Sequence, residues 1–202
     1  MDEQDRPGAP IDLSSSRLEA FSDAVMAVII TILAFELRPP NGVTLVALRG
    51  ALPSLFIYVL SFAFIAIYWN NHHHLLRATT RISGAVMWAN MFLLFWLSLI
   101  PVVTEWVRNF YGKSLPAASF GVVGLAAATA YWILVRAIIR ANGRDSTVAM
   151  AIDSDVKGKV SLLLYAAGVG LAFIEPWMAY VIYVAVAVMW LIPDRRFTGN
   201  PR

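Results

Sequence analysis

Long apolar segments separated by short polar connections dominate this chain. An α-helix needs about 20 mostly apolar residues to cross a bilayer, and five blocks of the sequence reach that length. These blocks are residues 18–37, 45–69, 82–107, 115–139 and 160–192. The last block is too long for one span and is interrupted by Glu175-Pro176, so we expect two helices joined by a very short turn. The sequence therefore predicts an all-α membrane protein with six transmembrane helices.

The composition supports a protein solvated by lipid. Of its 202 residues, 59% are hydrophobic and 14% are charged, whereas soluble domains are about half apolar and about a quarter charged. The net charge of +3 is small and the basic residues do not form one patch, which argues against nucleic-acid binding. The absence of cysteine excludes disulfides, thiolate nucleophiles and Cys-based metal sites. The polar, acidic first 16 residues do not resemble a signal peptide.

Basic residues near the predicted helix ends indicate the orientation. With six spans both termini lie on one side, and 12 of the 16 Lys and Arg residues fall on that side. Cytoplasmic loops carry an excess of Lys and Arg, so both termini are predicted to be cytoplasmic. The chain is divided into an N-terminal segment (1–16), a transmembrane domain (17–193) and a C-terminal tail (194–202). The longest polar connection, 140–159, has room for a short amphipathic helix.

Charged residues in the first predicted helix need partners, because charge inside a membrane is costly. Ser16 and Glu19 fit a capping box, in which Glu19 reaches back to the Ser16 amide. Asp23 lies deeper, and no neighbour one helical turn away can neutralise it. Arg17 is poorly placed to reach Asp23 within the same helix. The partner of Asp23 is therefore predicted to come from another helix or another subunit.

Three motifs carry a resemblance to a known family. Residues 17–23 (RLEAFSD) resemble the R-x-x-x-F-S-D signature of the transmembrane protein 175 family, which comprises endolysosomal potassium channels and smaller prokaryotic relatives. Trp69-x-x-His72 resembles the W-x-x-H motif of that family, and Asn90 followed by Pro101 resembles its N…P pairing. The motifs cover the first three predicted helices, and the last three helices match mainly by hydrophobic pattern.

The resemblance implies a homotetrameric, potassium-permeable cation channel whose first helix lines a central pore. It implies passive conduction without an enzymatic activity or a cofactor, in the plasma membrane of a prokaryote. By alignment from Asp23, the expected pore-lining residues are Val28, Thr31, Ile32 and Phe35. The residues expected to form a structural polar network that holds the helices together are Arg17, Phe21, Ser22, Asp23, Trp69, His72 and Asn90.

The physical pattern of the first helix is compatible with a pore wall. Val28, Thr31, Ile32 and Phe35 follow the i, i+3, i+4, i+7 spacing and form one stripe. Rings of the apolar side chains could block ions by dewetting, and a ring of Thr31 hydroxyls could replace part of an ion's hydration shell. The sequence has no T-V-G-Y-G filter, so only modest selectivity is expected. Without the resemblance, helix packing would be the ordinary reading of such a stripe.

Two other classes of protein fit the composition. The first is a secondary or proton-coupled transporter, with Asp23 and His72 as protonatable groups, although no internal repeat supports it. The second is a membrane-embedded assembly subunit without transport of its own. An enzyme is not expected, because Ser22 and Asp23 are adjacent in sequence and lack a nearby histidine that would complete a hydrolase triad.

The run His72-His73-His74 could suggest a metal site, since imidazole is a common transition-metal ligand. Consecutive side chains on a helix point about 100° apart, so these three cannot readily share one ion. We therefore expect no bound metal apart from the permeant potassium. His72 is expected to pack within the polar network, and His73 and His74 to meet water or lipid headgroups.

Overall fold

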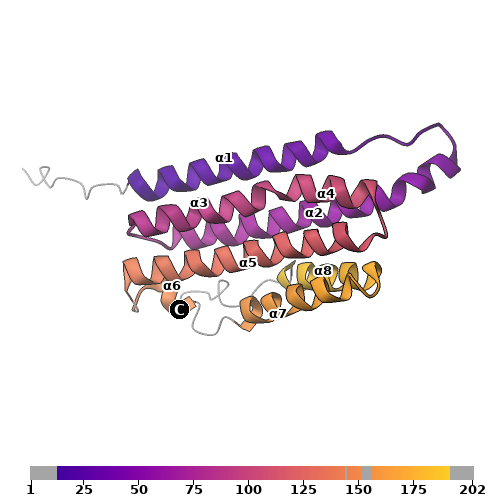
Figure 1. The fold of residues 1–202 in the computed structure, drawn as a ribbon. Coiled ribbons are helices and arrows are strands. Elements are labelled where there is room, and N and C mark those ends of the chain that lie inside the picture. The colour runs from indigo at the N-terminus through magenta and orange to yellow at the C-terminus, as the bar shows by residue number, and fades with distance from the viewer. Residues whose placement is uncertain (1–12, 144, 152–155, 192–202) are drawn as a thin grey trace, which may run out of the picture.

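The computed structural model describes residues 13–143, 145–151 and 156–191, and within these ranges all regular structure is helical (Figure 1). The helices are α1 (Leu13–Glu36), α2 (Leu45–Arg77), α3 (Gly84–Ser98), α4 (Ile100–Asn109), α5 (Ser114–Asn142), α6 (Thr147–Ala151), α7 (Val156–Leu171) and α8 (Pro176–Leu191). The predicted terminal segments lie largely outside the described residues.

Four stretches of the described chain are helical, long and apolar enough to cross a membrane. They are Ser15–Glu36, Leu45–Arg77, Gly84–Asn109 and Ser114–Asn142. The third combines α3 and α4 into one span. Helices α7 and α8 have 16 residues each, somewhat short of the usual length of about 20. The chain is an all-α membrane protein.

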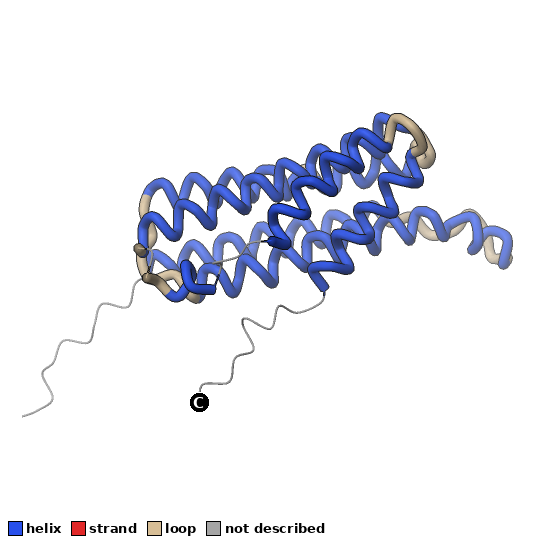
Figure 2. Tube along the Cα trace, turned by 90° about the horizontal axis from the view of Figure 1, so that it is seen from below, coloured by secondary structure: helices blue, strands red, loops and turns tan. Residues whose placement is uncertain are grey.

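The long helices form an elongated bundle in which α1 lies at one edge and the α7–α8 pair lies at the other (Figure 1). Helix α1 packs against α2, α3 and α4, and α5 packs against α3, α4, α7 and α8. Figure 2 shows the same bundle from below. This order leaves α1 covered on only one side by the rest of its own chain.

Proline and capping residues explain several helix ends. Helix α1 ends before Pro39-Pro40, and α2 begins after Thr44, whose side chain accepts a hydrogen bond from the Ala47 amide. The predicted third helix is interrupted at Leu99. Pro101 occupies the start of α4 and has no N–H to donate to the carbonyl of the preceding turn, so the helical hydrogen bonding breaks there.

Two helix boundaries differ from the sequence-based predictions. Helix α1 begins at Leu13, so Ser16 lies inside the helix and does not cap it, which corrects the capping box. Helix α2 continues past the predicted end at Trp69 to Arg77, because Leu75 and Leu76 are buried and keep the last turns packed. The 140–159 connection contains the short helix α6, and the predicted division of the last apolar block between two helices is confirmed.

Small residues allow close packing of α5 against the C-terminal helix pair. A Cβ atom added at Gly121 would lie 2.0 Å from the Tyr183 hydroxyl, and one at Gly124 would lie 2.8 Å from the Tyr165 ring. The Tyr183 hydroxyl donates a hydrogen bond to the Ala117 carbonyl, at 3.2 Å. Close approach at small residues is the usual way that membrane helices associate, because lipid provides little hydrophobic driving force.

Candidate functional site

One face of α1 is apolar and exposed, although the helix is otherwise packed into the bundle. Val28 is 55% exposed, Ile32 is 42% exposed and Phe35 is 88% exposed. On the opposite face Met26 and Leu33 are 0% and 1% exposed. The predicted stripe therefore corresponds to the side of α1 that the rest of the described chain leaves uncovered.

Thr31 provides the hydroxyl group on this exposed face. Its Oγ1 donates a hydrogen bond to the Val28 carbonyl, at 2.7 Å. Because the only hydroxyl proton is used within the helix, the oxygen presents lone pairs and no proton to its surroundings. Such an oxygen is a suitable acceptor for a cation.

Beneath the exposed face, Ser22, Asn90 and His72 form a chain of hydrogen bonds that we call the buried relay. Ser22 donates to the Leu18 carbonyl at 2.8 Å and accepts from Asn90 Nδ2 at 2.9 Å. The Asn90 Oδ1 atom lies 2.6 Å from His72 Nε2. All three relay side chains are fully buried, and they join α1, α2 and α3.

The donors and acceptors of the buried relay can be assigned from its geometry. Ser22 has one hydroxyl proton and gives it to Leu18, so its oxygen must accept from the amide nitrogen of Asn90. That orientation turns the Asn90 oxygen toward His72, which therefore donates from Nε2. The His72 Nδ1 atom is buried and has no hydrogen-bond partner among the described residues.

A second contact joins α1 to α2 near the same end of the bundle. The Trp69 indole N–H donates to Asp23 Oδ1 at 3.0 Å. Asp23 therefore has a hydrogen-bond partner on another helix, although the neutral indole does not balance its charge. The structure thus brings five of the seven residues of the expected polar network into two contacts.

The other two residues of the expected polar network lie apart from these contacts. Phe21 is 48% exposed, and Arg17 is also exposed. Within the described ranges, neither hydrogen bonding nor an ion pair links Arg17 to another side chain. Both residues belong to the part of α1 that the rest of the described chain leaves uncovered.

Sequence reasoning missed a contact made by His73. Its Nδ1 atom lies 2.9 Å from Glu19 Oε1, and its ring stacks on Trp69 with the ring centroids 5.7 Å apart. His73 therefore faces α1, and the expectation that it meets only water or lipid headgroups is wrong. The sequence did contain a signal for this contact, because residues four apart on a helix share a face. Glu19 and Asp23 have this spacing on one helix, and Trp69 and His73 have it on the next.

The far end of α1 is held by α4. An Arg108 guanidinium nitrogen donates a hydrogen bond to the backbone carbonyl of Glu36, the last residue of α1. Arg108 also lies 3.9 Å from the Glu105 carboxylate. Both ends of α1 are thus attached to other helices, while the stripe between them stays exposed.

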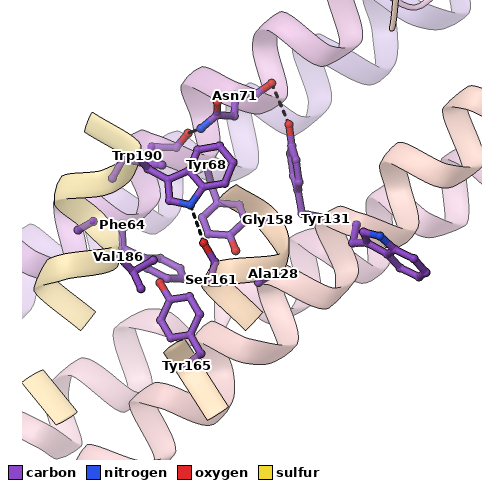
Figure 3. A pocket seen from close by; sticks show the side chains of 13 residues that line it. Phe64, Tyr68, Asn71, Ala128, Tyr131, Gly158, Ser161, Tyr165, Val186 and Trp190 are labelled. Carbon is purple, nitrogen blue, oxygen red and sulfur yellow. Dashed lines mark hydrogen bonds between the residues drawn. The ribbon is translucent and has the colours of Figure 1, made fainter. Parts of the chain in front are cut away.

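A separate cavity lies among α2, α5, α7 and α8 (Figure 3). Its walls are mainly aromatic and aliphatic, and Trp190 donates an indole hydrogen bond to Ser161 Oγ at 2.8 Å within it. The cavity does not contact α1 and contains none of the residues expected to line a pore.

Comparison with known proteins identifies the family. The sequence profile described as "Endosomal/lysosomal potassium channel TMEM175" matches residues 17–101, a range that contains all three motifs. A potassium channel of Chryseobacterium sp. (strain P1-3) is 43% identical over 91% of this chain and 96% of its own length. The chain belongs to the TMEM175 family. The resemblance found in the motifs is confirmed, and TMEM175 proteins are channels rather than enzymes.

Two further TMEM175 relatives are similar to this chain over most of its length. A potassium channel of Streptomyces collinus is 32% identical over 80% of this chain and 84% of its own length. The crystal structure of a lysosomal potassium-selective channel TMEM175 homolog from Chamaesiphon minutus has a TM-score of 0.75 and 26% identity. That likeness covers 90% of this chain and 98% of the homolog, so it includes the C-terminal helices that the motifs do not reach.

Proposed function

We propose that the chain assembles as a homotetramer that conducts potassium passively, with the exposed face of α1 lining the central pathway. The observation that carries this proposal is the exposed apolar stripe around Ile32 on a helix whose opposite face is fully packed. The names of the bacterial relatives, which are potassium channels, support the choice of ion.

A symmetric assembly explains why α1 is uncovered in the single chain. One helix cannot enclose a pore, so several copies of α1 must surround the pathway. Closed rings of identical subunits are the usual form of such assemblies. Arg17 and Phe21, exposed on α1, would then contact a neighbouring subunit, which accounts for their lack of partners within the described chain.

The pathway would combine apolar constrictions with one polar layer. Rings of Val28, Ile32 and Phe35 exclude water, and hence ions, when the helices stand close together. The ring of Thr31 hydroxyl oxygens, whose protons are held by the helix, replaces part of the hydration shell of a passing cation. Since side-chain hydroxyls hold an ion less rigidly than fixed carbonyls, selectivity for potassium over sodium is modest.

The buried relay and the Asp23–Trp69 contact act as structural anchors in this account. Ser22, Asn90 and His72 fix the cytoplasmic half of α1 against α2 and α3, which keeps the pore-facing stripe in register. His72 is fully enclosed and already engaged by Asn90, so it is poorly placed to relay protons as a transporter would require.

The topology completes the proposal. Helices α7 and α8 form the fifth and sixth spans, the domain covers residues 17–193, and the termini, 1–16 and 194–202, are cytoplasmic. The excess of Lys and Arg on that side supports the orientation. The prokaryotic relatives that match over most of their length support a plasma membrane location.

Reconstitution in a planar bilayer tests the proposal. With potassium on one side and sodium on the other, the reversal potential should favour potassium, and currents should appear as unitary steps. Val28→Asn should raise the unitary conductance several-fold by wetting the constriction. Leu163→Asn is the matched control, because Leu163 is 72% exposed on α7, away from α1. Slow, saturable flux without unitary steps would contradict the channel, and equal effects of the two variants would contradict the pore assignment.

A further inference from the structure

We propose that Glu19, Asp23 and His73 bind a divalent transition-metal cation of the Zn²⁺ class, which links α1 to α2. The site includes His73, which belongs to the run of three histidines that the sequence predicted not to share one metal ion. Three consecutive histidines on one helix still cannot readily share one ion. The structure instead combines one of these histidines with two carboxylates from a different helix.

The ligand atoms already lie close together. One carboxylate oxygen from each acid and one ring nitrogen of His73 lie within 4.8 Å of one another. Glu19 and Asp23 are four residues apart on α1, so both side chains project from one face of the helix. In a tetrahedral Zn²⁺ site with bonds of about 2.0–2.2 Å, ligand atoms stand roughly 3.3 Å apart. Small side-chain rotations are sufficient to reach that geometry.

The contact between His73 and Glu19 is better suited to shared coordination than to a hydrogen bond. His73 Nδ1 lies 2.9 Å from Glu19 Oε1, yet this buried atom has no hydrogen bond of acceptable direction to any described residue. Once Nδ1 loses its proton, this nitrogen and the carboxylate oxygen, which are close but not aligned for a hydrogen bond, can both point at a third atom. A cation between them would satisfy both groups.

Surrounding side chains orient the ligands. The Trp69 indole donates to Asp23 Oδ1, which leaves Oδ2 available, and the indole ring stacks on His73. Supporting contacts of this kind hold metal ligands in position. The donor set of one imidazole and two carboxylates favours Zn²⁺ and related ions over Mg²⁺ or Ca²⁺, which prefer oxygen ligands alone. Water would complete the coordination.

Arg77 is the charged neighbour that opposes binding. Its Nη1 atom lies 3.4 Å from His73 Nε2. Because a guanidinium can only donate, Nε2 accepts in this contact and the ring proton lies on Nδ1. When Nδ1 coordinates a metal, the ring proton moves to Nε2, and the exposed Arg77 side chain must turn toward solvent. Removing Arg77 should therefore strengthen metal binding, a result that a merely structural role for this cluster does not predict.

Isothermal titration of the purified, detergent-solubilised full-length channel with Zn²⁺ tests the site. We expect one Zn²⁺ per subunit. His73→Ala and Glu19→Gln should each weaken binding at least tenfold, and Arg77→Ala should strengthen it. His74→Ala is the matched control and should change the affinity less than twofold, because His74 is the neighbouring imidazole but is not part of the cluster.

Three results would overturn the site: no saturable binding by the parent protein, equal losses in His73→Ala and His74→Ala, or weaker binding in Arg77→Ala. Size-exclusion chromatography of each variant separates loss of a ligand from loss of the fold. If one substitution prevents assembly, the other ligand variant and Arg77→Ala still decide the outcome. Binding is measured without ion flow, so failure here leaves the permeation test of the proposed function unaffected.

Discussion

At the scale of single residues, the least replaceable side chains are the three of the buried relay. Ser22, Asn90 and His72 have no exposed surface and hydrogen-bond one another across three helices. An unpaired polar group in a buried site costs more than a hydrogen bond gains. The relay therefore makes the position of α1 depend on the two hydrogen bonds that Asn90 makes to Ser22 and His72.

Replacing Asn90 tests that dependence. Asn90→Ala leaves the Nε2 proton of His72 unpaired and opens a small cavity, so the free energy of unfolding should fall by about 2–4 kcal/mol. Ser98→Ala is the control, since Ser98 is exposed and bonds only to a carbonyl in its own helix. Thermal unfolding in detergent measures both variants. A loss for Asn90→Ala no larger than the control's would contradict the relay's structural role.

The Asp23–Trp69 contact should make a smaller contribution because it is exposed. Trp69→Phe removes the indole donor but keeps an aromatic ring, and Asp23→Ala removes the acceptor. In a double-mutant cycle on the free energy of unfolding, the coupling should be about 1 kcal/mol. A coupling near zero would show that the two side chains do not hold α1 to α2. A change in ion preference with unaltered assembly would instead favour direct contact between Asp23 and ions.

The residues of this region were only partly predictable. The absence of a suitable neighbour on the same helix was enough to predict that Asp23 has its partner elsewhere. Trp69 was included in the expected polar network only because of the family resemblance. The Glu19–His73 contact was missed because the predicted second helix ended at Trp69. His73 and His74 were expected to meet water or lipid headgroups, although the helix continues and turns His73 toward α1.

At the scale of whole elements, α5 organises the bundle, because it packs against both the α3–α4 span and the α7–α8 pair. The length of the apolar segments predicted α5 and most other helices well, because a spanning helix must match the thickness of the bilayer. Breaks within a span were harder to predict. Pro101 was recognised, but whether a proline bends a helix or divides it depends on packing around Leu99, which one sequence does not reveal.

Close packing at α5 gives a prediction at this scale. Gly121→Ala places a methyl group against the Tyr183 hydroxyl, so α8 must shift or Tyr183 must lose its bond to Ala117. The free energy of unfolding should fall by about 1–3 kcal/mol. Gly170→Ala on α7 meets no atom within 4 Å and should be neutral or slightly stabilising. Unfolding in detergent compares the two variants, and equal stability would contradict tight packing at this point.

At the scale of the whole molecule, the position of α1 at the edge of the bundle predicts that several copies of the chain assemble around this helix. The chain buries one side of α1 and leaves the other side apolar and uncovered, while both ends of the helix are fixed to neighbouring helices. The sequence could predict the stripe through its spacing. Only the structure shows which side of α1 faces away from the rest of the chain, because it places Met26 and Leu33 on the packed side.

We expect the exposed face of α1 to border a water-filled ion pathway. The chain contains no cysteine, so a single Cys variant carries one thiol that a charged, membrane-impermeant thiosulfonate can modify. In conducting channels, the reagent should rapidly alter the current of Ile32→Cys. It should leave Leu33→Cys unchanged, because Leu33 is only 1% exposed on the packed face. Conducting Ile32→Cys channels that the reagent leaves unmodified would contradict the account.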